Sequence, residues 1–225
     1  MIAGYEMKID GAIFDMDGTL VDSLSVWDFI WAEFGKTYLN DENFRPSKEA
    51  DKTVRTMILD DAMEFIHKTY AMGENGKELS DKANELLIIF YKEKAELKKG
   101  APELLEYLEG KGVKMCIASA SATDLIELAL ESCGIKKYFS RVFSCKETGK
   151  GKDCPDIYLE ALEYLGTPLK NTWVFEDSFV ALDTVKKIGL HRVGIFDENN
   201  FDNDKSESIS DIYVASGESL AKIII

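Results

Sequence analysis

Short apolar segments alternate with helix-like segments of about ten residues through the later part of this chain. Parallel strands need a crossover connection, usually a helix, so the alternation predicts right-handed crossovers and a parallel sheet covered by helices on both faces. The expected strands are residues 9–15, 113–118, 142–143, 172–175, 192–195 and 212–215. The expected fold class is therefore α/β, a Rossmann-like, doubly wound parallel sheet.

The region between the first two expected strands has a different pattern, because it is helical throughout. Apolar stripes with helical spacing predict helices over residues 24–38, 48–70 and 80–94. Trp27 and Trp31 share the first stripe with plainly apolar neighbours, so we expect them in the core. The change of pattern predicts two parts: a catalytic core made of residues 1–22 and 97–225, and an inserted α-helical cap domain made of residues 23–96.

Two aspartates, Asp15 and Asp17, stand at the end of the first expected strand, and Gly18 then lets the backbone turn away. Residues two apart on a strand point the same way, so both carboxylates can reach one point beyond it. Such a pair repels unless a cation compensates, and Mg²⁺ takes carboxylate oxygens as ligands. A surface turn is the alternative, because Asp and Gly are common turn residues. We favour a magnesium site with a carboxylate nucleophile.

Other strand ends carry polar residues that suit phosphoryl transfer. Ser119, followed by Ala120, ends a strand beside a helix N-terminus, where a phosphate oxygen can bind. Lys152 precedes another helix, and Glu176 and Asp177 follow a strand where acids are costly without positive charge nearby. Each has a simpler alternative: a helix cap for Ser119 or Asp177, and a solvated surface side chain for Lys152. Ligands of parallel sheets bind beyond the carboxyl ends of the strands, so we expect these side chains to meet.

In chain order, the residues Asp15-x-Asp17-Gly18-Thr19, Ser119, Lys152 and Glu176-Asp177-Ser178 resemble the motifs of the haloacid dehalogenase-like hydrolases with a helical cap. They are most similar to the beta-phosphoglucomutase-like subgroup, and the resemblance covers nearly the whole chain. It implies a Mg²⁺-dependent phosphatase that hydrolyses a small phosphorylated metabolite, a sugar phosphate or similar monoester, through an aspartyl-phosphate intermediate.

The resemblance also implies a role for each position. Asp15 corresponds to the nucleophile and Asp17 to the general acid and base. The implied substrate-binding residues, which hold the phosphate, are Gly18, Thr19, Ser119, Ala120 and Lys152. The implied metal-binding residues are Asp15, Asp17, Glu176 and Asp177.

One position departs from the subgroup. Beta-phosphoglucomutases carry a histidine about ten places beyond the second aspartate, and this chain has Trp27 there, while its two histidines, His67 and His191, lie elsewhere. Phosphatase chemistry is therefore favoured over phosphomutase chemistry, which is the alternative. Asp17 argues against dehalogenase and P-type ATPase chemistry, because an acid there can protonate a leaving alkoxide. A catalytically silent binding or regulatory module is a third hypothesis.

The chain is acidic, with a formal charge of −14 and a pI near 4.7, which argues against nucleic acid as a partner. No apolar run suggests a membrane span or signal peptide, and the four cysteines lack metal-site spacing. We therefore expect a cytoplasmic monomer or weak homodimer with reduced thiols. Arg45, Lys52 and Arg55 of the expected cap are candidates for contacts to a polar or anionic leaving group, with solvated surface residues as the alternative.

Overall fold

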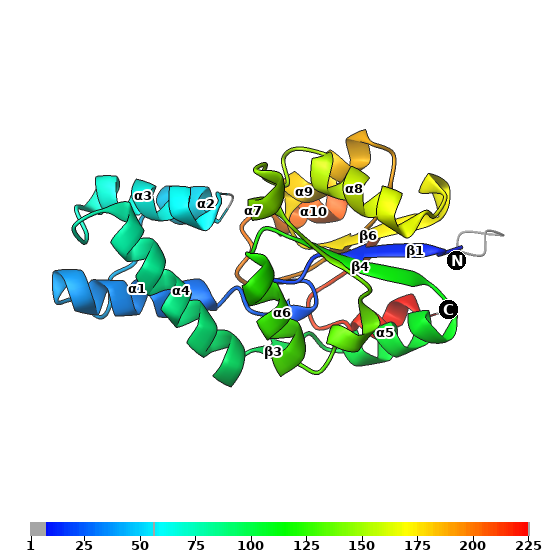
Figure 1. Cartoon of the computed structure of the whole chain (residues 1–225), viewed down its shortest axis with the longest axis horizontal. Helices are drawn as coiled ribbons and strands as arrows, with labels where there is room; N and C mark the ends of the chain where they lie inside the picture. The colour runs from blue at the N-terminus through cyan, green and yellow to red at the C-terminus, as the bar shows by residue number, and fades with distance from the viewer. Residues whose placement is uncertain (1–7, 56, 225) are drawn as a thin grey trace.

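The computed structural model describes residues 8–55 and 57–224, and its central feature is a parallel sheet. Within these residues six strands run in the order β5-β4-β1-β6-β7-β8, and every neighbouring pair is parallel (Figure 1). The strands are β1 (Gly11–Phe14), β4 (Lys114–Ser119), β5 (Val142–Ser144), β6 (Thr172–Glu176), β7 (His191–Ile195) and β8 (Ile212–Val214). The predicted α/β fold is confirmed, and each expected strand is present.

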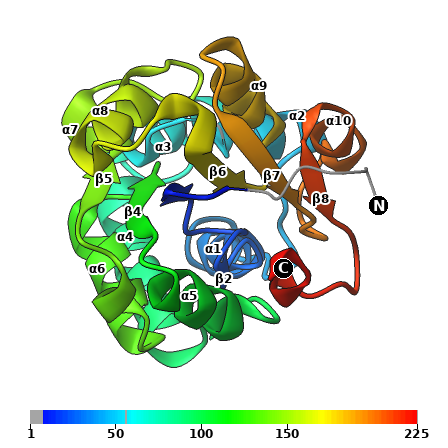
Figure 2. The same cartoon turned by 90° about the vertical axis from the view of Figure 1, so that its right-hand side faces the viewer.

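Helices cover both faces of the sheet, as Figure 2 shows. One face carries α8 (Asp156–Leu165), α9 (Phe179–Lys187) and α10 (Asn203–Ile209), with the short α7 (Cys145–Thr148) beside them. The other face carries α5 (Ala101–Gly110) and α6 (Thr123–Ser132). Single turns of 3₁₀-helix at Lys136–Tyr138, Leu169–Asn171 and Leu220–Ile223 complete the connections. Both faces are therefore shielded from water, which explains the nearly continuous apolar strands.

Strand β1 lies between β4 and β6, in the middle of the sheet. Ala12 and Phe14 belong to the core on the α5 and α6 face, whereas Ile13 belongs to the core on the α8 and α9 face. All three side chains are fully buried. This alternation fixes the register of β1, and it places Asp15, the next residue, at the carboxyl edge of the sheet.

Four helices form a group at one end of the sheet (Figure 1). They are α1 (Val26–Phe34), α2 (Lys48–Val54), α3 (Leu59–Tyr70) and α4 (Gly76–Glu93). The chain enters and leaves this helical cap through two short strands, β2 (Val21–Asp22) and β3 (Glu96–Leu97), which pair antiparallel. The pair lies where the sequence pattern changes, and we keep these positions as the proposed boundary between core and cap.

The predicted continuous helix over residues 48–70 is wrong, because α2 and α3 are separate. Ile58 is extended (φ −66°, ψ 141°), and α3 begins after it. Asp60 and Asp61 lie in the first turn of α3, where they interact favourably with the helix dipole. The break also brings Met57, Ile58 and Leu59 to the wall of a cavity described below. The apolar stripe alone could not reveal this, because it continues across the break.

Smaller differences occur at three other places. The first predicted helix, residues 24–38, ends as a π-helical turn at Gly35–Leu39, and α4 begins four residues before the predicted residue 80. The polar, acidic stretch at residues 197–204 includes the start of α10, a helix that the sequence pattern did not predict. This helix has no apolar stripe to reveal it, because Ser206 is its buried residue.

The four cysteines are free, as expected for reduced thiols. Within residues 8–55 and 57–224, none of the helices combines the length and apolar character needed to cross a bilayer.

A buried ion pair joins the segment that follows the cap to the loop after β7. Lys98 follows β3, and its ammonium contacts Asp197, whose side chain is 0% exposed; Asp22 lies 3.2 Å from the same ammonium. The Asp197 carboxylate also accepts a hydrogen bond from the backbone N–H of Asn199 at 2.8 Å. The pair therefore connects β2, β3 and the loop after β7.

We expect Lys98→Met to lower the free energy of unfolding by about 3–5 kcal/mol, because it leaves the Asp197 carboxylate buried without a counter-charge. Urea denaturation followed by circular dichroism measures this loss. The matched control is Lys99→Met, at an exposed neighbouring position, with an expected change within about 0.5 kcal/mol. Equal losses for the two variants would contradict a structural role for the ion pair.

Candidate active site

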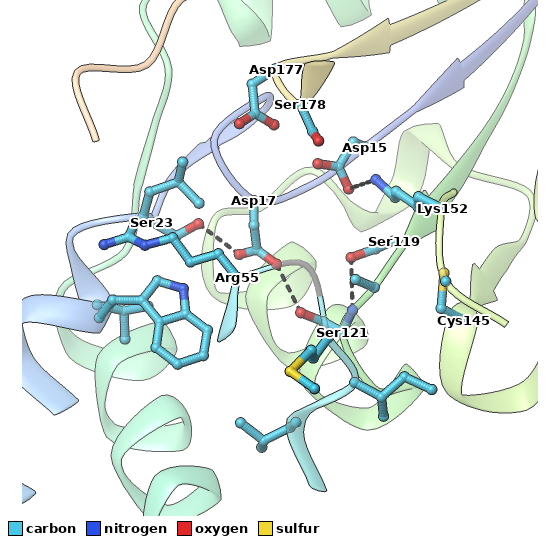
Figure 3. Close-up of a pocket in the computed structure, with 18 of the residues that line it drawn as sticks. Asp15, Asp17, Ser23, Arg55, Ser119, Ser121, Cys145, Lys152, Asp177 and Ser178 are labelled. Atoms are coloured by element: carbon cyan, nitrogen blue, oxygen red, sulfur yellow. Dashed lines mark hydrogen bonds and ion pairs between the residues drawn. The ribbon is translucent and has the colours of Figure 1, made fainter. Parts of the chain in front are cut away.

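Polar side chains from the ends of several strands meet at the carboxyl edge of the sheet, under the cap (Figure 3). Asp15 follows β1, Ser119 ends β4, Glu176 ends β6 and Asp177 follows it. Lys152 comes from the connection between α7 and α8. All five line one cavity of about 430 Å³. The structure thus brings together residues that the sequence placed at separate strand ends.

The closest contacts in this site are ionic. The Lys152 ammonium lies 2.5 Å from Asp15 Oδ1 and 2.7 Å from Glu176 Oε2. Its side chain is 11% exposed, against 7% for Asp15 and 1% for Glu176. Burial would lower the pKa of Lys152, but the two carboxylates raise it well above its ordinary value. Lys152 is therefore a fixed positive charge, whereas Lys150 is exposed and pairs with Asp156 at 2.6 Å.

The carboxyl groups beside Lys152 carry more negative charge than one ammonium can balance. Burial raises the pKa of Asp15 well above its ordinary value, and Glu176 raises it further, while Lys152 opposes the shift. Burial, and then Glu176, raises the pKa of Asp177 to about 8. If all are ionised, the three carboxylates and Lys152 leave two negative charges uncompensated.

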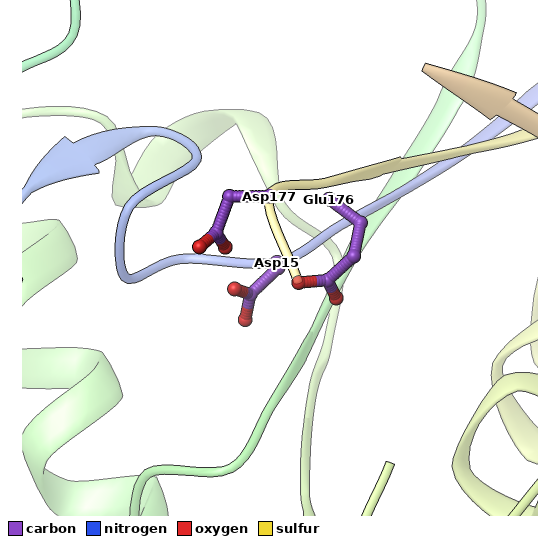
Figure 4. A group of neighbouring side chains, drawn as sticks. All are labelled: Asp15, Glu176 and Asp177. Carbon is purple, nitrogen blue, oxygen red and sulfur yellow. The ribbon is translucent and has the colours of Figure 1, made fainter. Parts of the chain in front are cut away.

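The same three acids form a possible metal site (Figure 4). One carboxylate oxygen each from Asp15, Glu176 and Asp177 lies within 4.8 Å of the others. Three buried oxygen donors with an excess of two negative charges suit a hard divalent cation such as Mg²⁺. Both carboxylate oxygens of Glu176 already have partners within the protein. Oε2 contacts Lys152, and Oε1 accepts a hydrogen bond from the Ser178 backbone N–H at 3.1 Å.

The loop after β7 holds Asp177 in place. Asn200 donates to Asp177 Oδ2 at 2.8 Å and to its main-chain oxygen at 3.0 Å, and the Ser206 hydroxyl donates to that same main-chain oxygen. Thr19 Oγ1 donates to Asp177 Oδ1 at 3.4 Å. Gly18 has a φ of +77°, and a Cβ there would lie 3.0 Å from the Asp177 carboxylate, so this turn requires glycine. Gly18 and Thr19 thus support Asp177, and their substrate contacts stay predictions, because neither lines the cavity.

Asp17 faces a different set of partners. Its Oδ1 accepts from Ser23 at 2.6 Å and from Tyr91 at 2.7 Å, and its Oδ2 accepts from Ser121 at 2.8 Å. Its carboxylate lies outside the three-acid group, so a metal contact of Asp17 stays a prediction. Burial, and then the Asp17 carboxylate, raises the pKa of the Tyr91 hydroxyl well above its ordinary value. Asp17 is therefore held by neutral hydroxyls.

Ser119 and Ala120 both line the cavity. The Ser119 hydroxyl is buried, and its oxygen accepts from the Ser121 backbone N–H at 3.1 Å. Its own proton has no acceptor among these contacts and can be donated to a ligand. This arrangement supports the predicted phosphate contact of Ser119, while Ala120 leaves room next to it.

The cap contributes residues that sequence reasoning assigned elsewhere or missed. Trp27, expected in the core, is partly exposed and lines the cavity, whereas Trp31 is buried as expected. Tyr91 was missed, since its contact with Asp17 joins positions 74 residues apart and no local pattern reports that. Among the candidate cap cations, Lys52 and Arg55 line the cavity, and Arg45 instead pairs with Asp28 at 3.2 Å.

A parallel α/β sheet with an acid-rich site at its carboxyl edge and a helical cap above it defines a class of capped phosphoryl-transfer hydrolases. The sequence model described as haloacid dehalogenase-like hydrolase matches residues 9–189. The chain therefore belongs to the haloacid dehalogenase-like hydrolase family, as its motifs indicated. The predicted phosphoric monoester hydrolase activity is supported by this membership and by the relatives named below.

Two similar proteins are named as phosphatases. A "Probable pseudouridine-5'-phosphatase" of Drosophila melanogaster is 28% identical over 204 residues, which cover 84% of this chain and 83% of that protein. A "Phosphorylated carbohydrates phosphatase" of Thermotoga maritima is 27% identical over 193 residues, 82% of this chain and 84% of that protein. The similarity extends over most of both chains in each case.

Solved structures share the fold. CbbY from Rhodobacter sphaeroides, in complex with phosphate, matches with a TM-score of 0.76 at 19% identity, over 96% of this chain and 100% of that one. Beta-phosphoglucomutase from Clostridium difficile matches with a TM-score of 0.71 at 18% identity, over 92% and 91%. At these identities the likeness concerns architecture, and it includes the cap.

The raised pKa of Asp177 predicts how stability depends on pH. An unfolded aspartate ionises near 3.8, whereas folded Asp177 ionises near 8, so between these values the unfolded state has lost a proton that the folded state keeps. In EDTA we therefore expect the melting temperature to fall as pH rises from about 5 to 8. Mg²⁺ should raise it more at pH 8 than at pH 5.5. The control Asp177→Asn should show a shallower fall, and an unchanged slope would contradict this origin.

Proposed function

We propose that this protein is a Mg²⁺-dependent phosphatase that hydrolyses a small phosphorylated metabolite, a sugar phosphate or similar monoester, through an aspartyl-phosphate intermediate. The observation that carries the proposal is the pairing of Asp15 with Lys152 at 2.5 Å on the floor of the cavity, with Asp17 held separately by three hydroxyls. The printed names of the two phosphatase relatives support the substrate class.

In the first step, an Asp15 oxygen forms a bond to phosphorus while the bond from phosphorus to the leaving oxygen breaks. Lys152 occupies Oδ1 of Asp15, so the other oxygen is available as nucleophile. Asp17 gives its proton to the leaving oxygen, which departs as an alcohol. Lys152 and the Ser119 hydroxyl compensate negative charge on the phosphoryl oxygens. Mg²⁺, held by Asp15 and Asp177 with Glu176 beside them, would supply the remaining positive charge against those oxygens.

In the second step, water attacks the phosphorus of the aspartyl-phosphate and Asp17 takes its proton. Inorganic phosphate leaves, and the Asp15 carboxylate is restored. Ser23, Tyr91 and Ser121 can donate to an ionised Asp17, and a hydroxyl oxygen can accept from a protonated one. The same contacts therefore suit both protonation states that the cycle requires.

A phosphomutase of the beta-phosphoglucomutase type is the alternative. It must keep a bisphosphate in the site, so it needs a cation for the second phosphate. On the cap side of the cavity, the described cations are already paired, Lys52 with Asp202 at 2.6 Å and Arg55 with Asp51 at 3.0 Å. Together with Trp27 in place of a histidine, this favours the phosphatase. A cytoplasmic location is also proposed, and the four free thiols support it.

We expect Asp15→Asn to reduce phosphate release from p-nitrophenyl phosphate at least a thousand-fold, since removing a hydrolase nucleophile can cost on the order of 10⁶ in kcat. A colorimetric assay with Mg²⁺ measures this loss. Asp153→Asn is the matched control, because its carboxylate also lines the cavity but lies outside the three-acid group. Substantial activity of Asp15→Asn would refute the nucleophile assignment. A wild-type protein without activity would instead favour the catalytically silent binding module.

For Asp17→Asn the expected loss depends on the leaving group. General acid catalysis typically raises the reaction rate 10²–10⁴-fold, and it matters most for a poor leaving group, whose oxygen needs a proton to depart. Release of the alcohol from a sugar phosphate should therefore slow by about that factor, and release of p-nitrophenolate in a pre-steady-state burst should slow much less. Stopped-flow absorbance and a coupled phosphate assay make the comparison. Equal losses for both esters would contradict Asp17 as the acid.

A further inference from the structure

The cap side of the cavity is mostly apolar, unlike the floor. Six of its lining residues are Leu24, Trp27, Met57, Ile58, Leu59 and Leu87. A sugar that placed its hydroxyl groups against such a wall would lose hydrogen bonds to water without replacing them, which is costly. The wall therefore fits the part of a substrate that carries few polar groups.

The two cations on this wall are paired with acids, and its acid, Asp60, accepts a hydrogen bond from the Ser80 hydroxyl at 2.8 Å. Lys52 pairs with Asp202, and the Arg55 guanidinium, 15% exposed, pairs with Asp51 and donates to the main-chain oxygen of Asn199 at 3.4 Å. A second anionic group on the leaving group would thus meet cations that already have counter-charges. The wall suits an uncharged group.

Trp27 gives this wall a rigid aromatic surface. Its ring stacks on Trp31, with centroids 5.4 Å apart and an interplanar angle of 28°. Trp31 is in turn fixed, because its Nε1–H donates to Asp51 Oδ1 at 2.9 Å and its ring meets Phe34 edge to face at 6.0 Å. Trp31 therefore supports one face of Trp27 while Trp27 itself stays partly exposed in the cavity. A flat ring can stack there at little entropic cost, because the platform is already ordered.

The cavity is also long enough for a ring at a distance from the phosphate. Tyr91 contacts Asp17, and Leu87 and Asn84 follow on the same face of α4 and line the cavity too. From Tyr91 to Asn84 the helix rises roughly 10 Å, at about 1.5 Å per residue. The Asn84 amide makes no hydrogen bond with the described residues, so it can offer a donor and an acceptor to the edge of a ring.

We propose that the leaving group of this phosphatase carries a flat, uncharged heterocyclic ring on a short sugar, as a nucleoside 5'-monophosphate does, and that Trp27 binds this ring by stacking. The inference rests on the proposed function for the position of the phosphate, which lies over Asp15. It adds the class of substrate that the cap selects. In this arrangement Asn84 faces the polar edge of the ring.

Two esters with the same leaving oxygen test the proposal. Uridine 5'-monophosphate and ribose 5-phosphate both release a primary 5'-alcohol, so a difference in kcat/KM reports binding of the base in the transition state. Base stacking on an aromatic side chain predicts a roughly ten- to hundred-fold preference for the nucleotide. Adenosine 5'-monophosphate, measured in parallel, separates a general stacking preference from a preference for one base.

Variants of the platform sharpen the test. Trp27→Ala should lower the ratio of the two kcat/KM values by about the same ten- to hundred-fold, and Trp27→Phe should recover part of it. The matched control is Phe29→Ala, an aromatic residue of the same helix that lies outside the cavity and packs under Lys94. Its ratio should equal that of the wild type. Melting curves identify any variant that fails to fold.

The outcomes distinguish failure of this inference from failure of the proposed function. A wild type that hydrolyses ribose 5-phosphate as well as both nucleotides, or a Trp27→Ala variant that keeps the wild-type ratio, overturns the inference and leaves the phosphatase intact. If no ester is hydrolysed, the proposed function fails, and calorimetric titration of Asp15→Asn with the two compounds then decides the inference. Tighter binding of the nucleotide supports the aromatic platform, and equal binding of the two overturns it.

Discussion

The charge balance around Lys152 is the constraint on which the site depends. Two buried carboxylates, Asp15 and Glu176, share one ammonium, and Asp177 adds a third acid with no ammonium of its own in this group. Buried charges are stable only when they are paired, so the group is balanced only when a further cation arrives or a proton is retained. The negative charge that makes the site demanding to fold is also what would attract a divalent cation, whose charge could then compensate that of a phosphoryl group.

Asp15 and Asp17, the proposed nucleophile and the proposed acid, have separate surroundings although only Met16 lies between them in the chain. Asp15 is surrounded by charges from the core, whereas Asp17 contacts the hydroxyl of Ser121 in the core and those of Ser23 and Tyr91 in the cap. Such different surroundings suit two aspartates of one strand end to the different tasks proposed for them. Since two of these hydroxyls come from the cap, the environment of Asp17 is complete only when the cap is docked.

The sequence predicted the sheet and the meeting of Asp15, Ser119, Lys152, Glu176 and Asp177, because both follow from a local rule: residues after parallel strands share one edge. Their catalytic roles are not tested by geometry alone and stay predictions. Tyr91, Asn200 and Lys98 were not predicted, since their contacts join distant segments of the chain. The break at Ile58 was also missed, because apolar periodicity reports which face is buried and not where the backbone turns.

The loop after β7 touches both halves of the molecule. Asn200 holds Asp177, while its neighbours Asn199 and Asp202 accept contacts from Arg55 and Lys52 of helix α2. Moving α2 away from the sheet disturbs the segment that anchors Asp177, and by reciprocity whatever fixes Asp177 also favours a docked α2. One loop therefore transmits the position of the cap helix to a residue of the three-acid group.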